Sequence, residues 1–348
     1  MDSSAQREGD AGAPEDGVGA AAPSPIDILD AAAMKATRAA ALASQRWLAR
    51  GDKSAADQAA TDAMRDQLKH AQGTGTVVIG EGEKDDAPML FNGEQVGTGE
   101  GPDFDIAVDP VEGTDFCSKG LPGALATIAF AEAGCMWSPG PAFYMDKLVV
   151  PPAARDAVDI DDEPERTLER VAEALGKPVD ELRVVVLDKP RHEELIQRLL
   201  KAGAAVHTPS DGDVAGAMDV LLPAGEADLL MGIGGTPEGV MTAGAARALG
   251  GGMQGRLAPQ KEEEATAVAD AGIDVQRVLQ RDDIVGGAAI FVATGISGGS
   301  LLNRPWRSGG TTFTESILIT AGRVQRVVEA SDQRVAGVSE PSGLTNTG

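Results

Sequence analysis

The sequence is poor in aromatic residues, cysteine and histidine. Aromatics make up 3% of the 348 residues, with a single tyrosine, so the core must be built from Ala, Val, Leu and Ile. Two cysteines, Cys117 and Cys135, cannot form a disulfide framework, and we read them as small buried residues. The three histidines stand apart in the sequence, and these absences argue against a zinc site built from Cys and His.

Long hydrophobic runs and a surplus of basic residues are also missing. No apolar run approaches the length of a membrane span, and no signal peptide opens the chain, so we expect a cytoplasmic protein without a membrane partner. Thirty basic against 54 acidic residues give a formal charge of −24. That balance argues against nucleic acid as a partner, and an anionic substrate must be attracted by local cations or a metal.

The chain divides by composition into four parts. Residues 1–24 form an acidic extension that we expect to be disordered, and residues 331–348 form a flexible polar tail. Between them, 42% hydrophobic residues suffice for a core, and the acidic, proline-containing connection of residues 151–165 marks a boundary. We therefore predict a metal-binding lobe over residues 25–150 and a second lobe over residues 151–330. Strands and helices alternate in the second half, which is typical of an α/β fold.

One stretch, residues 105–114, organises the interpretation. Ile106 to Val108 read as the end of a buried strand, with Asp109 at its lip. Pro110 cannot donate to a ladder, so we expect the strand to end there, and Thr114 is expected to cap a following helix. Glu112 and Asp109 then meet free backbone N–H groups at a strand-to-helix turn, although an ordinary surface turn has the same composition.

Several other charged or glycine-rich segments predict ordinary structural roles. Lys53 and Asp57 lie four residues apart, as in a helix-start ion pair. The charged run 261–264 is expected to be a solvated surface segment, and residues 323–329 either pair as a strand or fray. Residues 232–239 are glycine-rich, but their spacing does not give the Rossmann dinucleotide pattern.

Carboxylates gather at predicted strand ends. With a compact basic pair they form one constellation: Asp57, Glu81, Glu83, Asp109, Glu112 and Glu238, the cations Lys189 and Arg191, and the acids Asp211 and Asp213. Oxygen ligands without Cys or paired His favour Mg²⁺ or Mn²⁺. No nucleophile elbow and no Walker loop is present. The constellation predicts metal-assisted transfer of a phosphoryl group to water, with cations holding a second phosphate.

These residues carry a family resemblance. Residues 109–114, Asp-Pro-Val-Glu-Gly-Thr, match the motif of the lithium-sensitive, metal-dependent sugar and inositol phosphatases. Longer stretches resemble the class II fructose-1,6-bisphosphatases, and Cys117 and residues 151–154 are similar to the cyanobacterial members, which also act on sedoheptulose 1,7-bisphosphate. The stretches that resemble the class are residues 47–53, 80–83, 144–148, 189–192, 211–213 and 232–239.

The resemblance implies a fold and a set of residue roles. The fold is a layered α/β/α/β/α sandwich, and the oligomeric state is a homodimer or homotetramer. The implied metal ligands, for Mn²⁺ or Mg²⁺, are Asp57, Glu81, Asp109, Glu112 and Glu238. The implied catalytic residues are Thr114, Asp109, Glu112 and Glu81. The implied substrate contacts are Glu112, Gly113, Thr114, Tyr144, Lys189, Pro190, Arg191, Asp211, Gly212, Asp213 and Gly235.

The implied reaction removes the 1-phosphate of fructose 1,6-bisphosphate, a sugar bisphosphate, as in gluconeogenesis or the Calvin cycle. Three alternatives stay open. The enzyme could also act on sedoheptulose 1,7-bisphosphate, or it could be an inositol monophosphatase-like enzyme. A non-catalytic metabolite-binding protein on the same scaffold is the third. The basic pair of Lys189 and Arg191 favours a bisphosphate, since a monophosphate needs no second anion clamp.

Overall fold

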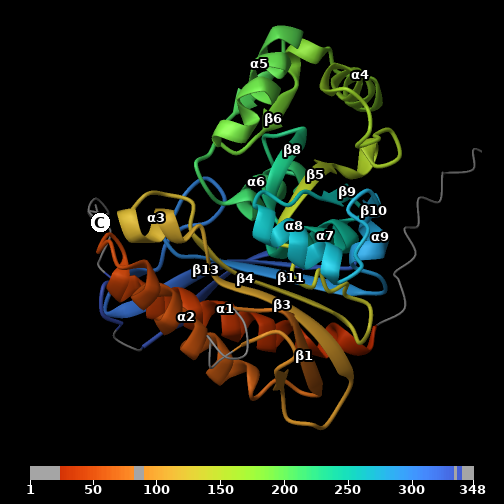
Figure 1. Ribbon diagram of the computed structural model, residues 1–348. Helices are drawn as coiled ribbons and strands as arrows, with labels where there is room; N and C mark the ends of the chain where they lie inside the picture. Colours follow the sequence, from red (N-terminus) through yellow and green to blue (C-terminus); the bar gives the residue numbers. More distant parts are fainter. Residues whose placement is uncertain (1–23, 82–89, 333–334, 339–348) are drawn as a thin grey trace, which may run out of the picture.

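The computed structural model describes residues 24–81, 90–332 and 335–338. The acidic extension up to residue 23, most of the predicted tail, and Glu83 therefore lie outside the described residues. Within the described part, strands form two sheets, one of eight and one of six strands (Figure 1). None of its helices is both long enough and apolar enough to span a bilayer.

The larger sheet runs through the lower half of the molecule in Figure 1. Strands β1 and β3 pair in parallel, and its other pairings are antiparallel. In spatial order its strands are β12 (Trp306–Ser308), β13 (Thr311–Thr320), β11 (Ala289–Gly295), β4 (Leu125–Glu132), β3 (Asp103–Glu112), β1 (Thr74–Ile79) and β2 (Gln95–Val96), with β14 (Arg323–Ser331) paired to β13.

The smaller sheet lies above it, with β5 antiparallel to both β8 and β9, and β6 parallel to β7 and β8. In spatial order its strands are β10 (Leu279–Gln280), β9 (Gly252–Leu257), β5 (Tyr144–Val150), β8 (Leu229–Gly235), β6 (Arg183–Val185) and β7 (Ala205–His207). The helices are α1 (Asp30–Ser44), α2 (Lys53–Leu68), α3 (Thr114–Lys119), α4 (Pro164–Leu175), α5 (Glu193–Ala202), α6 (Asp213–Leu221), α7 (Thr236–Leu249), α8 (Glu262–Asp270) and α9 (Arg281–Ile284).

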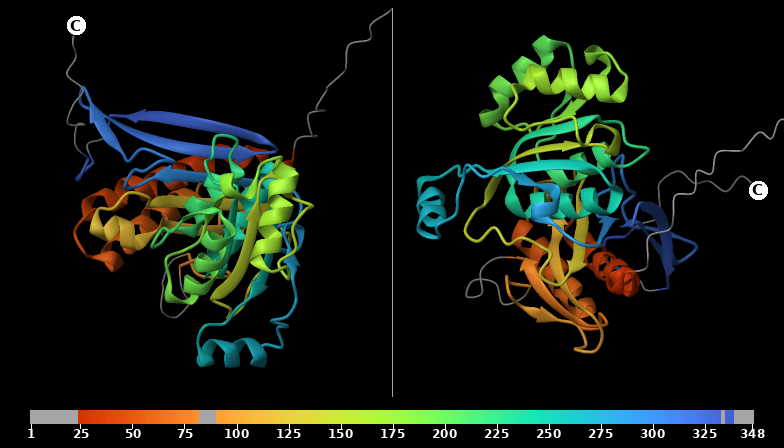
Figure 2. Two further views of the ribbon diagram at one scale, coloured as in Figure 1. Left: turned by 90° about the horizontal axis from the view of Figure 1, so that it is seen from above. Right: turned by 90° about the vertical axis from the view of Figure 1, so that its right-hand side faces the viewer.

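Alternation of side chains along the strands divides the apolar residues into separate clusters. On β3, Ile106 and Val108 face α1 and α2, whereas Ala107 faces α6 and α7. On β5, Val149 joins the cluster around α6 and α7, and Leu148 joins the cluster of α4 and α5. The layers are thus helix, sheet, helix, sheet, helix (Figures 1 and 2), and the predicted α/β/α/β/α sandwich is confirmed.

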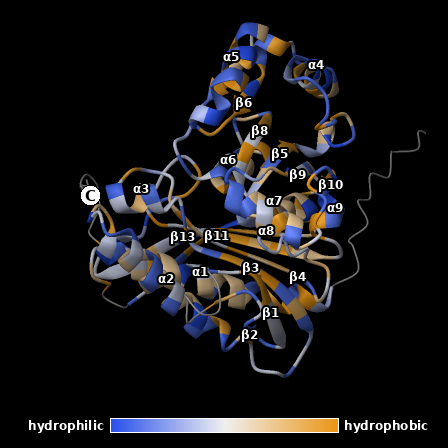
Figure 3. Ribbon diagram, viewed as in Figure 1, coloured by the Kyte–Doolittle hydropathy of each residue, from blue (hydrophilic) through white to orange (hydrophobic). Residues whose placement is uncertain are grey.

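The sheets are apolar where they are sandwiched, as the orange strands of Figure 3 show. Small side chains form much of the packing between the sheets: ten of the fourteen residues of α7 are buried, and four of them are alanines. Strand β5 belongs to the smaller sheet, and strands β11 to β14 return to the larger one. The division of the chain into lobes at residue 150 stays a prediction.

The expectation that the strand ends at Pro110 is wrong. Strand β3 continues to Glu112, and the register against β4 shifts between Asp109 and Glu112. Such a bulge leaves a residue out of the ladder, so the missing N–H of proline costs no hydrogen bond. Thr114 does not cap the helix either, because Gly113, at φ 74°, is the cap residue of α3.

Three smaller expectations also need correction or completion. Lys53 pairs with Asp115 of α3 and not with Asp57. Residues 261–264 are not simply a solvated segment, because the Glu264 carboxylate is buried and accepts hydrogen bonds from the backbone N–H groups of Phe143, at 2.7 Å, and Tyr144, at 2.9 Å. Residues 323–329 belong to β14, which pairs with β13 along its whole length.

Candidate active site

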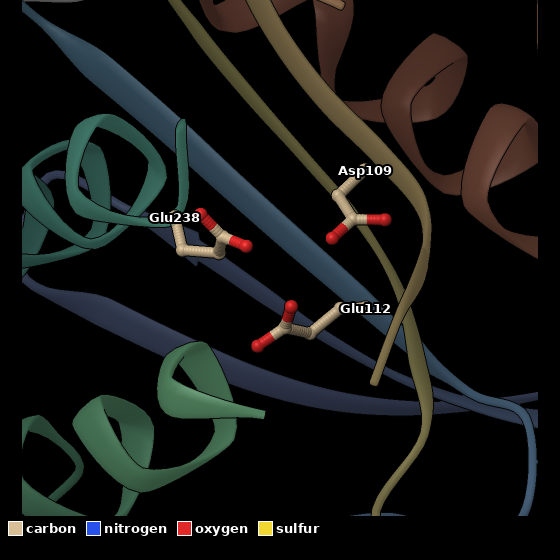
Figure 4. Close-up of side chains that lie close together, drawn as sticks. All are labelled: Asp109, Glu112 and Glu238. Carbon is tan, nitrogen blue, oxygen red and sulfur yellow. The ribbon is translucent and has the colours of Figure 1, made fainter. Parts of the chain in front are cut away.

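Three predicted metal ligands meet between the two sheets. Asp109 and Glu112 come from the bulge of β3, and Glu238 lies in the first turn of α7. One carboxylate oxygen of each lies within 4.8 Å of the others, and the three groups point toward one another in Figure 4. The bulge makes this possible, because it re-aims side chains that a regular strand would direct to fixed faces.

Asp57 and Glu81 extend this acidic cluster. Asp57, on α2, accepts a hydrogen bond from the hydroxyl of Thr114 at 3.3 Å, and that hydroxyl also lies 3.0 Å from the Val111 carbonyl. Glu81 lies two residues after the end of β1, and its charge interacts with those of Asp57 and Glu238. Five carboxylates from four separate segments thus surround one region, as the sequence predicts.

Burial and mutual repulsion hold these carboxyl groups toward the protonated form. Burial raises the pKa of Asp57 to about 6, and burial with repulsion from neighbouring carboxylates raises the pKa of Glu81 to about 7. The pKa of Glu238 rises to about 7 for the same reasons. Burial also raises the pKa of Asp109 and Glu112 well above the ordinary range. A cluster that repels itself in this way is stabilised by bound cations.

The local structure fits a hard divalent cation. Within the described residues, the buried Oε2 atom of Glu238 has no hydrogen-bond partner. A Cβ atom on Gly235 would come within 1.8 Å of that same oxygen, so a side chain at this position would displace the Glu238 carboxylate from the strand end. All donors in the cluster are oxygens, which suits Mg²⁺-like ions more than zinc. The acidic cluster can therefore hold a metal ion.

A cavity of about 690 Å³ adjoins the cluster. This volume is in the range of small-molecule sites. Its lining includes nine of the predicted site residues: Glu112, Tyr144, Lys189, Arg191, Asp211, Gly212, Asp213, Gly235 and Glu238. The other predicted site residues that the structure describes are not among the lining residues: Asp57, Glu81, Asp109, Gly113, Thr114 and Pro190. Thr114 instead lies beside Asp57.

Basic side chains occupy another wall of the same cavity. The Arg191 guanidinium donates two hydrogen bonds to the Ile233 carbonyl, at 2.7 and 3.1 Å, and lies 5.3 Å from the ring centre of Tyr144. Stacking and hydrogen bonding fix the plane of this fork. Lys189 and Lys261 line the cavity too. The cavity thus joins a carboxylate cluster to a group of cations.

Three residues that the sequence interpretation gave no role shape these walls. His192 is buried, with Nδ1 2.8 Å from the Leu187 carbonyl and Nε2 accepting from the Ile233 N–H at 2.8 Å, so the neutral ring ties the Arg191 loop to β8. Lys147 is buried on β5 beside Asp213, and Glu264 holds the backbone at Tyr144. The sequence signals for two of these residues are the position of Lys147 within an apolar strand and that of Glu264 four residues before the apolar Val268.

Comparison with known proteins agrees with this geometry. The family described as bacterial fructose-1,6-bisphosphatase, glpX-encoded, matches residues 28–332. The chain is 43% identical over 312 residues to "Fructose-1,6-bisphosphatase 1 class 2" of Escherichia coli (strain K12), covering 84% of this chain and 93% of that protein. The class 2 enzyme of Shigella flexneri matches with the same identity and coverage. The chain therefore belongs to the bacterial, glpX-encoded fructose-1,6-bisphosphatase family, and the predicted resemblance is confirmed.

Proposed function

We propose that the protein hydrolyses fructose 1,6-bisphosphate to fructose 6-phosphate and inorganic phosphate. The observation that carries this proposal is one cavity with a buried carboxylate cluster on one wall and Lys189 and Arg191 on another. A bisphosphate presents an anion to each wall. The family and the names of the relatives give the same activity.

The reacting phosphate binds at the acidic cluster in this proposal. Its metal ligands are Asp57, Glu81, Asp109, Glu112 and Glu238. A bound Mg²⁺ or Mn²⁺ supplies charge neutralisation of the phosphate and a lowered pKa of bound water. The Thr114 hydroxyl, whose proton is directed to the Asp57 carboxylate and the Val111 carbonyl, uses a lone pair to orient the attacking water. Backbone N–H groups at Gly113 and Thr114 donate to phosphate oxygens.

The distal phosphate and the sugar bind across the cavity. Arg191 and Lys189 hold the 6-phosphate, and the fork of the guanidinium matches two phosphate oxygens. Asp211 and Asp213 accept hydrogen bonds from sugar hydroxyls, and Tyr144 contacts the substrate. Gly212, Gly235 and Pro190 shape the binding loops. The proposal includes a cytoplasmic location and a homo-oligomeric state, which rest on the sequence and on the family resemblance.

Phosphate release from a panel of substrates tests the proposal. We expect turnover of fructose 1,6-bisphosphate with Mg²⁺ or Mn²⁺, none with a chelator, and turnover of inositol 1-phosphate lower by about a hundredfold or more, because it lacks a second anion for the basic wall. Sedoheptulose 1,7-bisphosphate in the same panel decides between single and dual specificity. A protein that binds fructose 1,6-bisphosphate with metal yet releases no phosphate would be a non-catalytic binding protein.

A further inference from the structure

A buried lysine lies directly behind the sugar end of the cavity. Lys147, on β5, is 2% exposed and is not among the residues that line the cavity. Its ammonium forms an ion pair with the Asp213 carboxylate and donates a hydrogen bond to the Gly235 carbonyl at 2.9 Å. A buried ammonium is stable only with such partners, so its position is closely determined.

Both partners of Lys147 do line the cavity. Asp213 is 6% exposed and begins α6, and Gly235 is the last residue of β8. The next backbone N–H, that of Val214, donates to a Glu112 carboxylate oxygen at 2.9 Å. The start of α6 is therefore held on one side by the acidic cluster and on the other by Lys147.

The glycines of β8 show how closely the chain is fitted around this pair. A Cβ atom on Gly234 would lie 2.0 Å from an Asp213 carboxylate oxygen and 2.8 Å from the Lys147 ammonium. On Gly239, at the first turns of α7, a Cβ atom would lie 3.3 Å from the Lys147 side chain. The strand and the helix that carry Gly235 and Glu238 thus pack directly against the lysine.

We propose that Lys147 is a positioning residue for the sugar end of the site, fixing the Asp213 carboxylate and the Gly235 carbonyl without touching the substrate. This role rests on the proposed function, because it assigns Asp213 to the substrate. A purely structural lysine would stabilise the fold and leave substrate affinity unchanged. Substrate affinity therefore separates the two roles.

Lys147→Met, Asp213→Asn and the double variant form a cycle that tests this role. We expect Lys147→Met to raise KM for fructose 1,6-bisphosphate about tenfold or more, since it frees Asp213 from its partner. If Lys147 acts through Asp213, the double variant has the KM of Asp213→Asn alone. A folded Lys147→Met protein with unchanged KM, or a double variant about tenfold worse than Asp213→Asn, would overturn the proposal. Because the double variant leaves no unpaired buried charge, the second comparison is available even where Lys147→Met alone fails to fold.

Lys177→Met is the control for loss of an ion pair with a buried carboxylate, at a lysine that is 43% exposed. Lys177 pairs with the buried Asp228 at 2.6 Å, and Asp228 also accepts from the Arg183 N–H at 2.9 Å, just before β8 begins and outside the cavity lining. We expect this variant to lower Tm and to keep KM within about twofold. A rise in KM equal to that of Lys147→Met would make the effect general destabilisation and overturn the proposal.

Calorimetry of fructose 6-phosphate binding in the presence of Mn²⁺ tests the role of Lys147 separately from the proposed function. No phosphate release by the wild type would count against the proposed function. The same cycle, read as Kd for fructose 6-phosphate, still decides the role of Lys147, with about a tenfold weakening expected for Lys147→Met. Unchanged Kd in that variant would overturn it.

Discussion

Two walls of one cavity differ in burial and in charge. The acidic wall is defined as Asp57, Glu81, Asp109, Glu112 and Glu238, of which Glu112 and Glu238 line the cavity and the other three belong to the adjoining cluster. These half-buried or buried carboxylates come from four segments, and burial, joined by mutual repulsion at all but Asp57, raises their pKa values. The basic wall, defined as Lys189, Arg191 and Lys261, is half-buried or exposed. Like charges brought out of water repel strongly and are stabilised only by bound cations, whereas exposed cations stay solvated.

This difference assigns distinct tasks to the two walls. The carboxylates of the acidic wall are stabilised by positive charge that the wall itself does not contain. A bound metal ion supplies such charge, as a metal-assisted reaction requires. In the proposed function the basic wall attracts an anion, in a chain whose net charge of −24 repels anions elsewhere. Substitutions on the acidic wall should therefore change kcat, and those on the basic wall should change KM.

The largest effect is expected on the acidic wall. Asp109→Asn removes the charge of a proposed metal ligand from the cluster, so kcat should fall by about a thousandfold or more while the fold is kept. Phosphate release under saturating substrate and metal measures this. Asp103→Asn, on the exposed start of the same strand, is the control and should leave kcat unchanged. Retained turnover in Asp109→Asn would contradict the assignment.

The second effect, on the basic wall, should appear in KM. Arg191→Ala removes the guanidinium fork, so KM for fructose 1,6-bisphosphate should rise about thirtyfold or more, with kcat within about threefold. Initial rates over a range of substrate concentrations measure both constants. Fructose 1-phosphate, which has no distal phosphate, should be affected little. An equal loss on both sugars would show that Arg191 acts on the fold of the loop and not on the 6-phosphate.

The third effect concerns the metal-free protein. The pKa values of Glu81 and Glu238 are about 7 in the fold and near the ordinary 4.5 when unfolded, so the folded state holds more protons between these values. Stability must then decrease as pH rises from about 4.5 to about 7. Asp115 and Glu165, with pKa values of about 2, are ionised throughout and contribute no slope near neutrality.

Thermal melts in chelator at about pH 5 and about pH 8 measure that decrease, and we expect Tm to fall by about 5 °C or more. Addition of Mn²⁺ should restore Tm at the higher pH, since metal binds the ionised carboxylates. Glu238→Gln should reduce the slope. A Tm that is independent of pH in chelator would show that these carboxyl groups do not repel one another in the folded protein.

The sequence predicts the acidic wall well and its surroundings poorly, for physical reasons. Asp109 and Glu112 follow the apolar residues of a strand and precede a turn-forming Gly113, and these signals are local in the chain. The continuation of β3 through Pro110 depends on a bulge opposite β4, a partner that local patterns do not identify. Local patterns assign no role to Lys147 and Glu264, because they place a charged residue at the surface and do not identify its buried partner.

The smallest effect tests whether the local cations of the basic wall or the net charge of the protein attract the substrate. Lys119→Gln removes the same charge as Lys189→Gln, but Lys119 pairs with Asp115 on the outside of α3, and it does not line the cavity. At physiological salt, screening acts over about 8 Å, so KM should stay within about twofold for Lys119→Gln and rise about tenfold for Lys189→Gln. The exposed pair contributes about 0.5 kcal/mol or less to the free energy of unfolding. Equal rises in KM would mean that net charge, and not the basic wall, attracts the substrate.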